Sequence, residues 1–115
     1  SFQAIIPRYR LKSCAWQMTS LLNQARFRSA WSGLDCRLRV DGGNVFLETR
    51  DAAALSWKAV RTFIPDGAAV AANNQPIFHP QGTVSNLATI TVSNSAGAYK
   101  ITLAISGRVR SVRTS

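Results

Sequence analysis

The feature that most constrains the fold is one long helical pattern at the N-terminus, followed only by strand patterns. Apolar residues recur at helical spacing over residues 8–31, Pro7 fits a first helical turn or a kink, and Gly33 is a residue type that ends helices. After Gly33 the apolar period changes to the alternation typical of strands. We therefore predict an α+β fold in which a long N-terminal helix packs on antiparallel β-sheet.

The predicted helix is apolar on two sides. At about 100° per residue, its broader apolar face contains Leu11, Cys14, Ala15, Met18, Leu21, Leu22 and Ala25. Tyr9, Trp16 and Phe27 form a second stripe on nearly the opposite side, and the basic residues on the flanks between are Arg8, Arg10, Lys12, Arg26 and Arg28. We expect the broader face to pack on the protein's own sheet. The aromatic stripe then either contacts another molecule or is covered by a local loop.

The rest of the chain predicts short antiparallel strands separated by turns. We expect strands at residues 36–40, 45–50, 57–63, 68–72, 76–78, 87–92, 99–105 and 108–113. Turn signals occur at 41–43, 65–67, 73–74, 80–82 and 93–97, and residues 51–56 suggest a loop or an edge. Nothing resembles a linker, so 1–115 is expected to form one domain, with a helix stem over 1–32 and a β head over 33–115.

The charge of the chain is strongly positive and unevenly distributed. Fourteen Lys and Arg against five Asp and Glu give a net charge of +9, and eleven of the fourteen basic residues are Arg. No acidic residue occurs in 1–34 or in 67–115. Arginine matches phosphate groups bidentately, so this distribution is typical of a protein that binds a polyanion. The alternative is that the charge serves only solubility, although such surfaces usually mix both signs.

Few residues suggest catalysis, a metal site or a cofactor. The single histidine, His79, stands beside Pro80 in a predicted turn, so we expect a surface residue rather than a member of a Ser-His-Asp set. Cys14 and Cys36 match no zinc or CxxC spacing, and their positions along the helix and the following strand favour two separate buried thiols. A disulfide between them is the alternative, which an oxidising compartment would favour. Core positions are expected for Trp57, Phe63 and Phe78. We expect no enzyme and no cofactor.

Four motifs, in order along the chain, together resemble one known family. They are Ser1-Phe2-Gln3 before the helix, LNQARFRSA at residues 22–30, IFHPQG at residues 77–82 and SGRVR at residues 106–110. In these motifs the chain is similar to the GspH/FimT-type pseudopilins, minor subunits of type II secretion systems and type IV pili. That family has an A-R-x-x-A run at the end of its helix, an I-x-F-x-P-x-G-like central strand and a G-R-x-R ending. The resemblance implies a pilin-like fold over nearly the whole chain.

The resemblance also implies a location and partners. Family members begin with a leader that a prepilin peptidase removes, followed by about 20 to 25 apolar residues that anchor the protein in the inner membrane. Neither segment occurs in residues 1–115. The β head would then lie in the periplasm, or in a pilus fibre at the cell surface, with other pilins as partners. Tyr9, Trp16 and Phe27 would face neighbouring helices in the fibre.

Members of the family that are similar to FimT bind DNA during natural transformation through the C-terminal G-R-x-R motif. This chain matches the motif at Gly107, Arg108 and Arg110. Residues two apart in a strand share a face and lie about 7 Å apart, close to the spacing of successive phosphates. The sequence therefore predicts non-specific binding of double-stranded DNA through the phosphate backbone.

Other basic residues are candidates to extend this site. Arg113 comes three residues after Arg110, so its side chain is expected on the opposite face of the strand. It joins the pair only if the tail bends. The remaining candidates are Lys100, Arg37 and Arg39. Two other functions stay open at this point. The chain would be a structural minor pseudopilin if the arginines pair with carboxylates or line a subunit contact, or an unrelated basic binding module.

Overall fold

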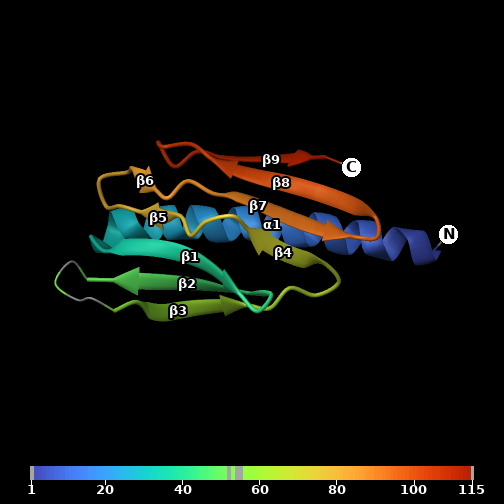
Figure 1. The fold of residues 1–115 in the computed structure, drawn as a ribbon, viewed down its shortest axis with the longest axis horizontal. Helices are drawn as coiled ribbons and strands as arrows, with labels where there is room; N and C mark the ends of the chain where they lie inside the picture. The colour runs from blue at the N-terminus through green and yellow to red at the C-terminus, as the bar shows by residue number, and fades with distance from the viewer. Residues whose placement is uncertain (1, 52, 54–55, 115) are drawn as a thin grey trace.

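A single long helix forms the spine of the molecule. The computed structural model describes residues 2–51, 53 and 56–114, so part of the predicted loop at 51–56 lies outside the described residues. Helix α1 (Phe2–Ser32) runs along a molecule that measures 54 × 24 × 22 Å. Figure 1 shows α1 lying lengthwise behind two sheets, with its N-terminal end projecting beyond them. The predicted α+β class is confirmed.

The helix begins earlier than predicted, because it continues through Pro7. A proline near the start of a helix removes only one backbone hydrogen bond, so the helix tolerates it there. The Pro7 carbonyl accepts a hydrogen bond from Asn94 Nδ2 at 2.7 Å. At the other end Gly33 has a φ of 73° and its N–H donates to the Ser29 carbonyl, which ends the helix as predicted. Among the described residues, no helix has the length and apolar character needed to cross a membrane.

The strands form two antiparallel sheets, which we name A and B. The strands are β1 (Asp35–Asp41), β2 (Asn44–Arg50), β3 (Lys58–Phe63), β4 (Ala69–Ala72), β5 (Ile77–Phe78), β6 (Val84–Ser85), β7 (Thr89–Asn94), β8 (Gly97–Leu103) and β9 (Val109–Arg113). Sheet A has the order β3-β2-β1-β5-β6, and sheet B has the order β4-β7-β8-β9. Both sheets pack on α1 (Figure 1), and β9 is an edge strand of sheet B.

Two features of the strand arrangement were not part of the sequence prediction. Strand β6 was not predicted, since only two residues pair there. The strands on either side of residues 73–74 do not form a hairpin, because β4 pairs with β7 and β5 pairs with β1. Asn73 remains tied to β7, since its Oδ1 accepts a hydrogen bond from the Thr89 N–H at 2.8 Å. The turn therefore carries the chain from sheet B to sheet A.

The core lies between the broader apolar face of α1 and the inner faces of the two sheets. All seven predicted helix residues are buried there, and Phe78 is almost fully buried. Cys14 and Cys36 are buried free thiols, as predicted. Burial raises the pKa of both thiols, that of Cys36 to about 11. The prediction of a core position is wrong for Trp57, which lies on the outer face of sheet A.

Candidate nucleic-acid interface

The G-R-x-R motif occupies the turn between β8 and β9 and the start of β9. The Gly107 N–H donates to the Ala104 carbonyl at 2.9 Å, and the Ala104 N–H donates to the Arg108 carbonyl at the same distance. Gly107 has a φ of 86°, a backbone conformation that strongly favours glycine. The turn places Arg108 next to the first residue of β9, at the free edge of sheet B.

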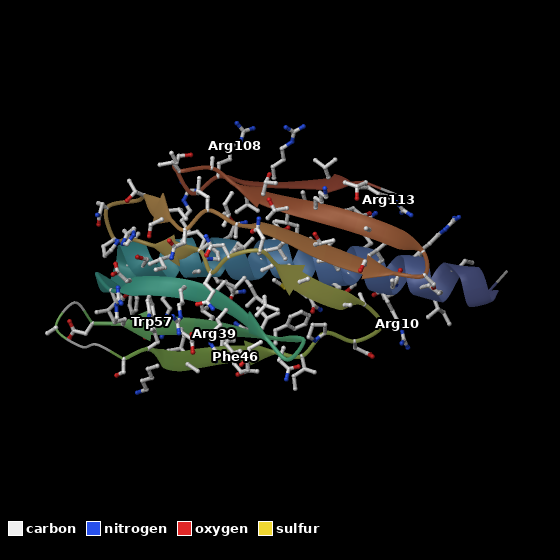
Figure 2. The ribbon with its side chains drawn as sticks, in the orientation of Figure 1. Arg10, Arg39, Phe46, Trp57, Arg108 and Arg113 are labelled. Carbon is white, nitrogen blue, oxygen red and sulfur yellow. The ribbon has the colours of Figure 1, made fainter. Side chains whose placement is uncertain are left out.

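Arg108 and Arg110 lie on the outer face of sheet B. Arg110 pairs with Thr102, and both side chains are exposed, whereas the neighbouring pair Val109 and Leu103 faces the core. Arg108 has the same parity as Arg110 and is also exposed. Figure 2 shows Arg108 pointing away from the body of the molecule. The two arginines border a shallow hollow of about 310 Å³ whose other lining residues are Thr102, Leu103 and Ala104.

Lys100 shares this face and Arg113 does not. Lys100 pairs with Val112 on the outer face, diagonally next to Arg110, at a Cα separation expected to be roughly 7–8 Å. Arg113 pairs with Tyr99, which packs against the core. Its guanidinium lies 5.8 Å from the Tyr99 ring centroid and donates to the Ala96 carbonyl at 2.8 Å. The tail does not bend, so the structure brings together Lys100, Arg108 and Arg110 without Arg113.

The outer face of sheet B contains no acidic residue. The residues that alternate with its buried positions are Ala69, Ala71, Thr89, Thr91, Ser93, Ala98, Lys100, Thr102, Arg110 and Val112. No ion pair of Lys100, Arg108 or Arg110 occurs within the part of the chain that the structure describes. Small neutral side chains surround these cations, so an anion can approach them without meeting a carboxylate.

The outer face of sheet A is different, because its arginines are paired. Arg37 Nε donates to Glu48 Oε1 at 2.7 Å, and Arg39 Nε donates to the same oxygen at 3.1 Å. Burial alone would raise the pKa of Glu48, but the hydrogen bonds from Arg39 and Arg37 outweigh it and hold that pKa below its ordinary value. Arg50 lies 3.5 Å from Asp35. The structure therefore places Arg37 and Arg39 on a different sheet from Arg108 and Arg110, paired with a carboxylate, and the proposed site below leaves them out.

Aromatic rings stack on the same arginines. The Arg37 and Arg50 guanidinium carbons lie 4.4 and 4.5 Å from the Trp57 ring, and that of Arg39 lies 4.4 Å from the Phe46 ring. Figure 2 shows Arg39, Phe46 and Trp57 together over sheet A. These stacking contacts are favourable electrostatically and explain why Trp57 is outside the core. Together with the ion pairs they hold the arginines of sheet A in place.

His79 is less exposed than a surface turn residue should be, and the prediction for it needs correction. Its side chain is only 24% exposed, with Nδ1 at 3.0 Å from Asp35 Oδ1 and Nε2 at 2.8 Å from Ser85 Oγ. The Asp-His-Ser order is that of a catalytic triad, but catalysis also needs oxyanion donors beside the serine and a substrate cleft. His79 and Ser85 do not line the hollow beside Arg108 and Arg110, nor the three hollows along the helix that are described next. We interpret the contacts as a bridge across β1, β5 and β6.

The second stripe of the helix is exposed, and it forms one wall of a groove. Tyr9, Trp16 and Phe27 are 72%, 70% and 74% exposed, and Trp31, which the sequence prediction omitted, is 78% exposed. Trp31 stands one turn beyond Phe27, so the helical spacing could have identified it. Three successive hollows of about 560, 570 and 560 Å³ lie between this stripe and edge strand β3. No local loop covers the stripe in the described part of the chain.

Comparisons with known proteins identify the fold. No protein-family model and no curated protein sequence matches the chain. The minor pseudopilin EpsH from the type 2 secretion system of Vibrio cholerae is similar in structure, with a TM-score of 0.76 and 15% identity, over 90% of this chain and 97% of EpsH. The type IV minor pilin FimU of Pseudomonas aeruginosa gives a TM-score of 0.69 and 12% identity, over 88% of this chain and 91% of FimU. The chain therefore has the fold of minor pilins and minor pseudopilins.

Proposed function

We propose that the protein is a minor pilin-like subunit that binds duplex DNA through the outer face of sheet B during DNA uptake. One observation carries this proposal, namely the segregation of charge between the two sheets. On the outer face of sheet A, Arg37, Arg39 and Arg50 are paired with carboxylates. Arg108 and Arg110, in contrast, face solvent on a surface without acids. Unpaired cations of this kind are available to a polyanion.

The geometry suits phosphate groups rather than base edges. Arg108 directly precedes β9 and Arg110 lies within it, so at strand spacing the two are about 7 Å apart and can each contact a phosphate of the same backbone. The face is a sheet surface without an element that enters a DNA groove to read bases, so the binding is non-specific. Gly107 provides the backbone conformation of the turn from which Arg108 points outward. Lys100 adds a third cation on the same face. Arg113 is not part of the proposed site, because it lies on the other side of β9.

Gel retardation of random duplex DNA at low salt tests this proposal. We expect the double variant Arg108→Ala plus Arg110→Ala to lose retardation that the wild-type protein gives. Lys58→Ala plus Arg61→Ala is the matched control, since it removes two exposed cations from edge strand β3 of the other sheet. The proposal is wrong if the two double variants retard DNA equally.

Assembly with other pilins is a second function that a separate observation favours. The exposed stripe Tyr9, Trp16, Phe27 and Trp31 leaves an apolar surface without a partner inside the described chain. We propose that neighbouring pilin helices cover this stripe in a fibre, with the β head in the periplasm and an inner-membrane anchor N-terminal to residue 1. Both functions are compatible, because the stripe and the outer face of sheet B lie on different elements. A structural pseudopilin without a DNA role would keep the stripe and show no DNA binding.

A further inference from the structure

Arg26 contacts the G-R-x-R turn, although it comes from helix α1. A Cβ built at Gly107 would lie 3.0 Å from Arg26 Nε and 3.1 Å from its Cδ. Gly107 is buried, whereas Arg26 is exposed. The Arg26 side chain therefore lies against the turn that precedes Arg108. Since α1 packs on the inner face of sheet B, Arg26 reaches this turn from the side opposite to Arg108 and Arg110.

Arg26 belongs to a line of cations along one flank of the helix. Arg8 and Arg26 are 18 residues apart, which is five full helical turns, so they point in the same direction, and Lys12 lies about 40° from that direction. All three are exposed, and within the described residues none has an ion pair. The absence of acidic residues from 1–34 leaves this line uncompensated.

The line runs alongside edge strand β9. The start of β9 is beside Arg26, as the Gly107 contact shows. The end of β9 pairs with Tyr99 near the β7–β8 turn, and that turn is tied to the N-terminal part of the helix by the bond from Asn94 to Pro7. Strand and helix therefore run in opposite directions along the same edge of the molecule, as Figure 1 also shows.

We infer that Arg26, with Lys12 and Arg8, forms a second line of phosphate contacts, so that the β9 edge of the protein contacts both strands of a DNA duplex. This inference rests on the proposed DNA-binding function and deepens it. Helix α1 packs directly on sheet B, so the two lines of cations lie on either side of the β9 edge. The two backbones of B-DNA lie likewise on either side of its major groove, which is about 12 Å wide. The two lines of cations then match the two backbones that border one groove. A single strand can engage only one line, so the interface selects double-stranded DNA.

Fluorescence anisotropy with a labelled 25-bp duplex and with one of its strands tests the inference. Arg26→Met is the informative variant, because methionine keeps much of the apolar stem that packs on the Gly107 turn and removes the charge. Arg28→Met is the matched control, because Arg28 is also exposed but lines the hollow beside β3 on the other flank of the helix. We expect Arg26→Met to reduce the salt slope for the duplex by about 0.9, the value for one phosphate. The variant should bind the single strand as the wild type does, and Arg26→Lys should restore duplex binding.

Each outcome distinguishes the inference from the proposed function. The inference is overturned if Arg26→Met and Arg28→Met have equal effects, while loss of binding in the Arg108/Arg110 double variant still supports the proposed function. Equal weakening of duplex and single-strand binding by Arg26→Met would also overturn it, because the second line would then give no selection. If the wild-type protein binds neither DNA, both proposals fail.

Discussion

Gly107 is the residue on which the arginine turn depends. Its φ of 86° disfavours any side chain, and a Cβ there would lie 3.0 Å from Arg26 Nε, so the Arg26 side chain would have to shift slightly. The backbone conformation is therefore the main requirement for glycine here, and the contact with Arg26 adds to it. The G-R-x-R motif in this chain thus has a structural first position and two exposed cationic positions.

Substitution of Gly107 by alanine should be costly. We expect a loss of about 1–2 kcal/mol from the positive φ alone, and a further loss from the displaced Arg26 side chain. Gly82→Ala is the control, since Gly82 has a φ of 98° and a Cβ there would have no atom within 4 Å. Urea denaturation of both variants measures the difference. Equal losses of unfolding free energy would mean that the Arg26 side chain moves aside without cost and that the contact adds no requirement for glycine.

Glu48 holds the arginines of sheet A, and its contribution to stability should depend on pH. Its pKa in the folded protein lies below the ordinary value of 4.5, so the contribution is present above that pH and is lost as the pH falls through the folded value. We expect Glu48→Gln to lower the free energy of unfolding by about 1–3 kcal/mol at pH 7, with the deficit shrinking below pH 4.

Chemical denaturation between pH 3 and pH 7 measures this effect. Asp51→Asn serves as the control, because Asp51 is exposed and has no ion pair among the described residues. A deficit for Glu48→Gln that stays constant over this range would contradict the account. So would an Asp51→Asn variant with the same pH dependence.

At the scale of elements, α1 has two apolar faces, one packed on the sheets and the other exposed. Met18 is fully buried against the sheets, whereas Trp16 is 70% exposed on the opposite side. We expect Met18→Ala to cost about 2–5 kcal/mol of unfolding free energy, and Trp16→Ala to change it by less than about 0.5 kcal/mol. Thermal or urea unfolding of the two variants checks this. A similar cost for both would mean that the protein's own domain covers the aromatic stripe.

The helix was largely predictable from the sequence, because the helical spacing of its apolar residues shows directly which of them share a face. The β1–β2 hairpin was predictable for the same reason, as alternation around residues 41–43 fixes both faces and the turn. The assignment of β4 and β5 to different sheets was not, since a turn signal does not tell which strands pair afterwards. The pairing of β4 with β7, and the hydrogen bond from the Thr89 N–H to Asn73 beside it, both involve residues that are distant in sequence.

The candidate site was predictable only in part, for an equally physical reason. The alternation of side chains along a strand was enough to predict that Arg113 and Arg110 lie on opposite faces of β9. Parity could not reveal that Arg37 and Arg39 converge on Glu48, or that Trp57 lies between arginines on the outer face, because these contacts cross strands. Nor could it place Arg26 against Gly107, which requires the packing of helix on sheet.

At the scale of the whole molecule, the net charge of +9 is not spread evenly. Four of the five acidic residues, Asp35, Asp41, Glu48 and Asp66, pair with basic residues on sheet A or with Arg10. The remaining positive charge is concentrated on the helix flanks, on β3 and on sheet B. A field of this kind attracts polyanions from a distance and becomes weaker as salt is added.

The salt dependence of duplex DNA affinity tests the central claim most directly. With about 3 to 5 phosphates contacted, the logarithm of the association constant should fall against the logarithm of salt concentration with a slope near −3 to −4.5. Arg108→Ala plus Arg110→Ala should make that slope shallower by about 1.8, the value for two phosphates, while Lys58→Ala plus Arg61→Ala should leave it nearly unchanged. The account is contradicted if the slope of the Arg108/Arg110 variant equals that of the wild-type protein.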